Sequence, residues 1–134
     1  MKSIRIASGL LLAAATFCVA AQETRTPRIE KSMDGSYEGE IFGEAAPGDK
    51  FGQLKIGMSS GDVQNVMDRV PDRQHSYESG KRWIPFYGGN DARRMQVLYK
   101  GHGCLTFTDG NVWGGAGGDL IKIQHDPSGA CYQP

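Results

Sequence analysis

Residues 59–70 carry the pattern that most constrains the fold of this chain. Ser59 stands where the N-cap of a helix is expected, and Asp62 places a carboxylate in the first turn. Pro71 ends the helix. Apolar side chains recur at the helical spacing i, i+3, i+4, i+7, namely Val63, Val66, Met67 and Val70. A short helix with a single apolar stripe is unstable alone, so the pattern predicts that a sheet covers that stripe.

Three downstream segments alternate apolar and polar residues, as strands with one buried face do. They are residues 94–100, 104–108 and 120–125. The Gly-His-Gly sequence at 101–103 predicts a hairpin between the first two. Upstream, Asp49 is placed to cap a brief helical turn that carries Phe51 and Leu54. Together these segments predict an α+β fold, with two short N-terminal helices packed on a three-stranded antiparallel sheet.

Residues 1–21 have the features of a secretory signal peptide. Lys2 and Arg5 precede an apolar run that is too short to span a membrane, and the segment has no acidic residue. Cys18 is the residue that a lipoprotein would use as its lipid anchor. The bulky Phe17 before it fits a lipoprotein cleavage site poorly. We therefore expect ordinary cleavage at the end of the segment, with lipid attachment at Cys18 as the alternative.

The remaining chain divides into an arm and one domain. Residues 22–48 are rich in glycine and charge without a sustained period, so we expect a flexible arm in which 37–42 are a weak strand candidate. We expect residues 49–134 to form one α+β domain. The chain has 15 basic and 15 acidic residues, of which the signal peptide removes two basic ones, so the exported form has 13 against 15. A net charge of about −2 makes capture of nucleic acid an unfavoured function.

Cys104 and Cys131 are the two cysteines that remain after export. An oxidising compartment favours a disulfide between them, and an antiparallel sheet brings the end of the third predicted strand beside the start of the second. His102 and His125 lie near these cysteines in the sequence and could serve as metal ligands. The spacing matches no known metal-binding pattern, however, so neither a metal nor another cofactor is predicted.

Residues 57–61 match the G-x-S-x-G pattern of serine hydrolases, with Ser59 as the nucleophile. That motif normally follows a central strand of a large, mostly parallel sheet, which a domain of this length cannot build. Ser59 also has an ordinary role as the helix cap. We therefore predict a capping serine and no enzymatic activity, and keep a small secreted serine hydrolase as a further alternative.

The stretch 81–87 is the most unusual in the chain because it concentrates large apolar side chains between charged neighbours. One interpretation makes it an edge strand that completes the core, with its proline tolerated at the free edge. The other makes it an exposed aromatic patch that docks a partner, since contact hot spots favour Trp, Tyr and Arg. The predicted partner-contact residues are Trp83, Phe86 and Tyr87.

Several short motifs resemble those of the SmpA/OmlA family, the BamE-like small lipoproteins of outer-membrane assembly. They are residues 51–54, 56–59, Val63, Val66, 71–73, 99–103 and 105–107. The resemblance implies a non-enzymatic interaction module in the periplasm, with the assembly machinery at the inner face of the outer membrane as its partner. The same architecture is similar to that of secreted beta-lactamase-inhibitor proteins. The alternative that follows is a secreted or periplasmic binding protein that acts as an enzyme inhibitor.

Overall fold

A six-stranded mixed sheet forms the body of the protein in the computed structural model, which describes residues 26–110 and 117–134. The expected signal peptide and Cys18 lie outside the described residues. In chain order, the elements are β1 (Arg28–Lys31), β2 (Glu38–Phe42), the 3₁₀ turn η1 (Lys50–Gln53), α1 (Ser60–Met67), β3 (Arg73–Glu78), the 3₁₀ turn η2 (Lys81–Trp83), β4 (Arg93–Tyr99), β5 (Gly103–Thr108) and β6 (Leu120–His125). None of the helices in this part of the chain is long and apolar enough to cross a membrane.

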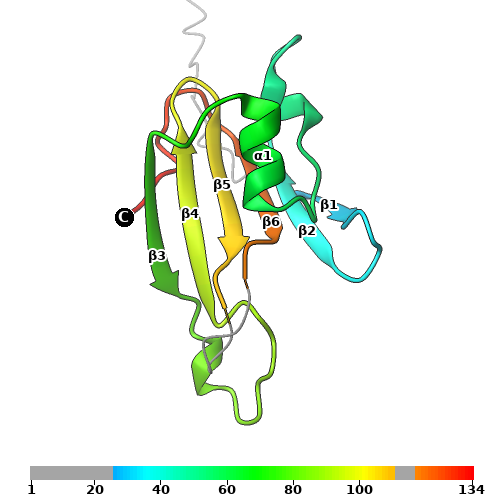
Figure 1. Ribbon diagram of the computed structural model, residues 1–134, viewed down its shortest axis with the longest axis vertical. Coiled ribbons are helices and arrows are strands. Elements are labelled where there is room, and N and C mark those ends of the chain that lie inside the picture. The colour runs from blue at the N-terminus through cyan, green and yellow to red at the C-terminus, as the bar shows by residue number, and fades with distance from the viewer. Residues whose placement is uncertain (1–25, 111–116) are drawn as a thin grey trace, which may run out of the picture.

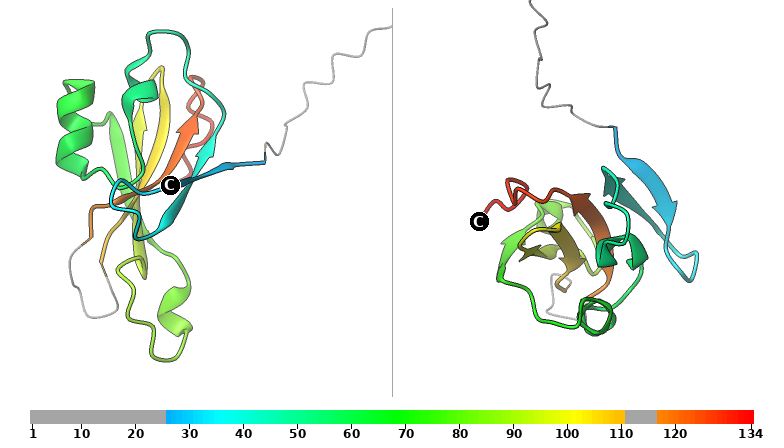
Figure 2. Two further views of the ribbon diagram at one scale, coloured as in Figure 1. Left: turned by 90° about the vertical axis from the view of Figure 1, so that its right-hand side faces the viewer. Right: turned by 90° about the horizontal axis from the view of Figure 1, so that it is seen from above.

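The strands lie in the order β1-β2-β6-β5-β4-β3. The run from β3 to β6 is an antiparallel meander, and β1 and β2 form a second antiparallel pair. The two parts join where β2 pairs in parallel with β6, with Ile41 beside Ile123. Figures 1 and 2 show the resulting curved sheet, with α1 on one face and the C-terminal segment on the other.

The hydrophobic core lies between the sheet and α1. Val63 and Met67 are the buried residues of α1, and each contributes about 2 kcal/mol by leaving water. The helix ends there because Asp68 adopts a left-handed backbone conformation with φ 57°. Val70 therefore lies beyond the helix and is 67% exposed, unlike its place in the predicted stripe. The core residues are Ile41, Phe51, Leu54, Ile56, Val63, Met67, Val97, Tyr99, Leu105, Phe107, Leu120 and Ile123.

The predicted fold class, two short helices on a three-stranded antiparallel sheet, is wrong. Three further strands enlarge the sheet, one pairing is parallel, and α1 is the single α-helix of the described residues. Two of these strands, β1 and β2, come from the segment expected as a flexible arm. In β2 only Gly39 and Ile41 are buried. A single buried apolar side chain is too little to mark a strand in the sequence. The edge strand β3 carries polar residues on both faces and showed no alternation.

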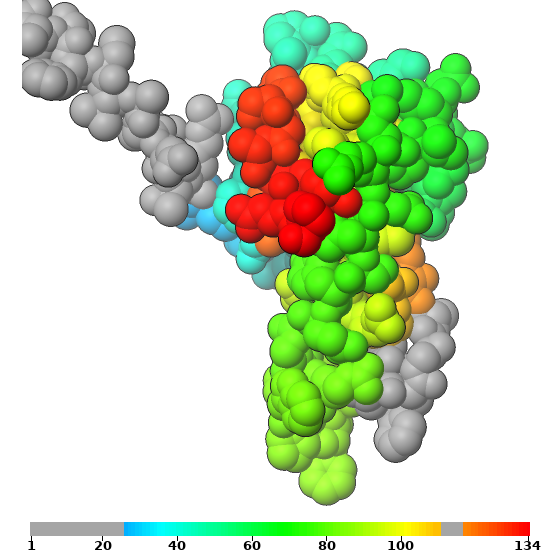
Figure 3. Space-filling model, turned by 90° about the vertical axis from the view of Figure 1, so that its left-hand side faces the viewer, coloured from blue at the N-terminus to red at the C-terminus, as the bar shows by residue number. Residues whose placement is uncertain are grey.

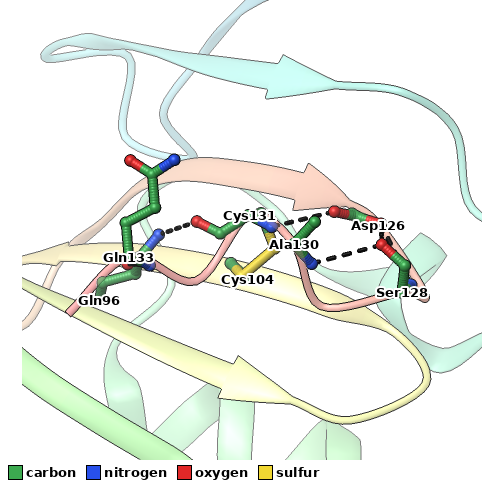
Figure 4. Close-up of a disulfide and its surroundings, with 7 residues drawn as sticks. All are labelled: Gln96, Cys104, Asp126, Ser128, Ala130, Cys131 and Gln133. Atoms are coloured by element: carbon green, nitrogen blue, oxygen red, sulfur yellow. Dashed lines mark hydrogen bonds between the residues drawn. A yellow bond between two sulfur atoms is a disulfide. The ribbon is translucent and has the colours of Figure 1, made fainter. Parts of the chain in front are cut away.

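The predicted central strands, the hairpin and the disulfide are confirmed. β4, β5 and β6 match the predicted segments, and Gly101 takes up the left-handed conformation that the β4–β5 turn requires, with φ 82°. Cys104 and Cys131 form a disulfide with a Cα–Cα distance of 6.1 Å, on the face of β5 opposite Leu105. Figure 4 shows the bond beside Gln96, whose side chain donates to the Cys131 carbonyl at 2.8 Å and accepts from the Gln133 amide at 3.0 Å.

Candidate functional site

The connection between β3 and β4 projects from one end of the sheet. In Figures 1 and 3 it extends beyond the body, at the end opposite the β4–β5 turn. The loop begins at Ser79 and turns at Gly80, whose φ of 87° suits glycine. One turn of 3₁₀ helix, η2, follows, so the stretch is not the core-completing edge strand of the first interpretation.

The outermost residues of this loop, 83–86, are called the tip. Trp83 is 84% exposed, Ile84 51% and Phe86 fully exposed, which makes them three of the six large apolar residues exposed in the described part of the chain. Residues 82–88 line an open hollow of about 510 Å³. All residues lining it belong to the loop itself, so no other described element covers the tip. An exposed apolar cluster of this kind is typical of a contact surface.

Asp91 ties the two ends of the loop together. Its carboxylate lies 2.6 Å from Lys81 Nζ and 3.3 Å from an Arg94 nitrogen, and it accepts the hydroxyl hydrogen of Tyr87. The Ser79 hydroxyl lies 2.6 Å from the backbone carbonyl oxygen of Asp91. We call these five residues the base. The base holds a loop that has no apolar core of its own.

The two cations of the base, Lys81 and Arg94, share the single carboxylate of Asp91. Burial alone raises the pKa of Asp91, but hydrogen bonds from Lys81, Tyr87 and Arg94 outweigh it and hold that pKa below its usual value. The hydrogen bond to Asp91 in turn raises the pKa of Lys81. Both groups are therefore charged at neutral pH, and the ion pair keeps its strength there.

Tyr87 occupies a different place from the other two predicted contact residues. Its hydroxyl donates to Asp91, and the Lys81 ammonium lies 5.4 Å from the centre of its ring. Burial raises the pKa of the phenol, so it stays protonated and able to donate. Trp83 and Phe86 thus extend outward, while Tyr87 belongs to the base. The pairing of Tyr87 with Asp91 could not be predicted from the sequence, because it forms only in the folded loop.

Phe86 takes up a backbone conformation that an aromatic residue rarely adopts, with φ 60°. Such a conformation costs on the order of 1 kcal/mol and persists only where neighbouring structure holds it. The Tyr87 amide donates to the Ile84 carbonyl at 3.2 Å, which closes the turn around Phe86. The exposure of Phe86 is therefore enforced by the loop and does not reflect a loose chain end.

A polar cleft of about 600 Å³ lies beside the base. Lys81, Tyr87 and Arg94 line one side, and Glu40 and Lys122 of the neighbouring strands β2 and β6 line it as well. Sequence reasoning missed this cleft because it depends on the parallel β2–β6 pairing. Its lining mixes both signs of charge, so it does not select one class of charged ligand.

Ser59 serves as the predicted helix cap. Its hydroxyl oxygen accepts the Asp62 amide at 3.1 Å, and the Asp62 carboxylate accepts the Ser59 amide at 3.2 Å. Among the described residues no hydrogen bond joins Ser59 to a histidine. The histidine nearest to an acid, His102, places its Nδ1 2.6 Å from the Asp49 carboxylate, at η1. Within residues 26–110 and 117–134, no group of His, Cys, Asp and Glu is arranged to hold a metal ion.

Comparisons with protein-family models, with curated proteins and with solved structures find no match to this chain. The likeness to the BamE-like family therefore stays a resemblance of short motifs. The fold which that resemblance implied is the one corrected above. The function is best argued from the geometry of the loop and of its base.

Proposed function

We propose that this chain is an exported, non-enzymatic interaction module of the bacterial envelope and that the tip is its contact surface. The observation that carries the proposal is the exposure of Trp83 and Phe86 on a loop whose two ends are tied together by Asp91. Export is supported by the signal-peptide pattern of residues 1–21 and by the disulfide, which favours an oxidising compartment.

A fixed loop improves binding because less conformational entropy is lost when a partner is engaged. Trp83 offers the largest apolar side chain for this purpose, and tryptophan is enriched among residues that dominate contact energies. Tyr87 contributes by holding Asp91 and not by touching the partner. The contact residues are therefore Trp83, Ile84 and Phe86.

Contact is favoured over catalysis by the chemistry of Ser59. A nucleophilic serine needs a base within hydrogen-bond reach, whereas the Ser59 hydroxyl is engaged by the first turn of α1. The short motifs shared with the BamE-like family favour a component of the outer-membrane assembly machinery as the partner. The location we propose is the periplasm, at the inner face of the outer membrane.

Cell fractionation tests the proposal. Wild-type protein should sediment with the envelope, and the double variant Trp83→Ala/Phe86→Ala should move to the soluble periplasmic fraction. The matched control is Ile29→Ala/Met33→Ala, which removes two exposed apolar side chains from the β1 region and should sediment like wild type. Circular dichroism should show that all three proteins are folded. Equal sedimentation of the tip variant and the wild type would contradict the proposal.

A further inference from the structure

We propose that two copies of this chain pair through the edge strand β1, with Arg28 of each copy facing Glu30 of the other. Among the described residues β1 pairs with β2 alone, so its other edge is open to a further strand. All four residues of β1 are exposed, and Figure 2 shows the strand at the rim of the sheet. This edge contains no residue of the tip or the base, so the inference goes beyond the proposed function.

The open edge of β1 presents backbone groups that can accept another strand. The Ser32 amide donates to the Tyr37 carbonyl at 2.8 Å, so these two residues form a hydrogen-bonded pair next to the β1–β2 ladder. Such pairs recur at every second residue of an antiparallel ladder, so the even-numbered residues of β1 bond to β2. The amides and carbonyls of Ile29 and Lys31 therefore point away from β2. An edge of this kind is a template for a strand of another chain.

The charges of β1 select a second copy of β1 as that strand, and they select its register. Two copies of one strand pair about a two-fold axis, and facing residues must direct their backbone groups the same way, so they are an even number of positions apart. An axis at Ile29 sets Arg28 opposite Glu30 twice, once in each direction. An axis at Arg28, Glu30 or Lys31 would set a charge opposite its own copy, which is destabilising.

The register centred on Ile29 satisfies both the backbone and the side chains of the strand. The Ile29 amide and carbonyl bond to those of the other copy, and the Lys31 amide reaches the carbonyl of Pro27. Arg28 and Glu30 take the positions without hydrogen bonds across the new edge, where facing side chains lie closest. Within residues 26–110 and 117–134 neither of them forms an ion pair. Ile29, which is 55% exposed, meets its own copy at the axis.

The opposite edge strand, β3, is not self-complementary in this way. Its charged residues are Arg73 and Glu78, which are separated by an odd number of positions and so cannot face each other in a self-pair. Of the two edges in the part of the chain that the structure describes, β1 is therefore the one whose charges match a second copy. Pairing there joins two six-stranded sheets across one antiparallel seam.

Charge reversal tests the inference, with the exported protein followed by sedimentation velocity over a range of concentrations. A seam of four residues is small, so we expect a weak dimer with a Kd of roughly 10–100 µM. Arg28→Glu and Glu30→Arg each set like charges opposite one another in both pairs, and each alone should weaken the dimer at least about tenfold. An equimolar mixture of the two variants should restore the dimer, because every charge then faces its opposite.

Two further sets of variants test the edge and the register. Arg73→Glu makes the same change of charge on β3 and should dimerise like wild type. Ile29→Cys should cross-link to its own copy on mild oxidation, whereas Lys31→Cys, which faces Pro27 of the other copy, should not. Circular dichroism should show that every variant is folded.

The mixing experiment also defines the results that would overturn the inference. One is a wild-type protein that stays monomeric up to about 1 mM, well above the expected Kd. Another is dimerisation of Arg28→Glu or Glu30→Arg alone at the wild-type level. A third is a mixture of these two variants that stays monomeric, because folded strands with matched charges would then fail to pair.

Discussion

The two ends of the central strands β4 and β5 are built for different purposes. At one end, beside the β4–β5 turn, the Cys104–Cys131 disulfide and Gln96 fasten the C-terminal segment against the sheet. At the other end, the loop from Ser79 to Asp91 leaves the sheet and exposes Trp83 and Phe86. We call these the closed end and the loop end. Stability and contact are therefore separated between the closed end and the tip, so substitutions at the closed end should leave binding intact and substitutions in the tip should leave stability intact.

The largest effect on stability should come from the closed end. Cys104 and Cys131 are 27 residues apart, and in the chain-entropy model a loop of this size stabilises the fold by about 3.5 kcal/mol. The double variant Cys104→Ala/Cys131→Ala should therefore lose roughly that much free energy of unfolding, measured by urea denaturation. Any folded fraction should still bind the envelope. Loss of binding by folded protein would break the separation between the two ends.

A substitution in the base of the loop should change both the stability of the fold and envelope binding. Asp91→Asn removes the charge that Lys81 and Arg94 share, and hydrogen bonds to charged groups contribute about 1.5–3 kcal/mol. We expect a loss of about 2 kcal/mol in the free energy of unfolding and weaker envelope binding, because the tip is no longer held. Asp68→Asn, at the exposed end of α1, is the matched control and should change neither. Normal binding by Asp91→Asn would show that the tip works without its base.

The helix cap should affect stability alone. Ser59→Ala removes the acceptor of the Asp62 amide and should cost about 1 kcal/mol of unfolding free energy. Envelope binding should stay at the wild-type level because the Ser59 hydroxyl bonds to the Asp62 amide of α1 and, among the described residues, to no residue of the tip or the base. The wild-type protein should also resist labelling by a serine-reactive phosphonate. Labelling that disappears in Ser59→Ala would instead support the hydrolase alternative.

The smallest expected effect is a pH dependence at the closed end. Burial lowers the pKa of His125, although Asp49 opposes the shift, so the folded state binds its proton less readily than the unfolded state. The contribution of neutral His125 is complete above the unfolded pKa of about 6.5 and is lost as pH falls through the lower folded pKa. Urea denaturation should show falling stability below about pH 6.5.

His125→Gln, which cannot gain this proton, should flatten the dependence in that range. The pKa of Asp49 is lowered in spite of burial, because the Phe51 amide and His102 bind its carboxylate. Its contribution is lost only in more acidic solution, below the range in which His125 titrates. An unchanged pH profile in His125→Gln would exclude His125 as the source.

The spacing of apolar residues predicted those helices and strands that have a continuous apolar stripe facing the core. Val63 and Met67 mark α1, and Leu105 and Phe107 mark β5, because each side chain faces one common core. The same reasoning could not find β1 and β2, whose place depends on a parallel pairing between Ile41 and Ile123, distant in sequence. The apolar spacing also predicted a helix that reaches Val70. The helix ends at Met67 because Asp68 is left-handed, and the spacing of apolar residues carries no information on that backbone conformation.

The candidate site was predictable in composition and not in arrangement. The sequence singled out Trp83 and Phe86 by their apolar side chains among charged neighbours, and the structure places both in solvent. It could not choose between a core strand and an exposed patch, since both need the same residues. It also grouped Tyr87 with them, because the hydrogen bond to Asp91 arises only when the loop closes.

The central claim is that the tip leaves water when the protein engages the envelope. Its most direct test is the emission of Trp83 in Trp113→Phe as isolated envelope membranes are added. The account predicts a shift to shorter wavelength that follows binding and that is absent without membranes. Binding with unchanged Trp83 emission would contradict it, because the protein would then be held through another surface.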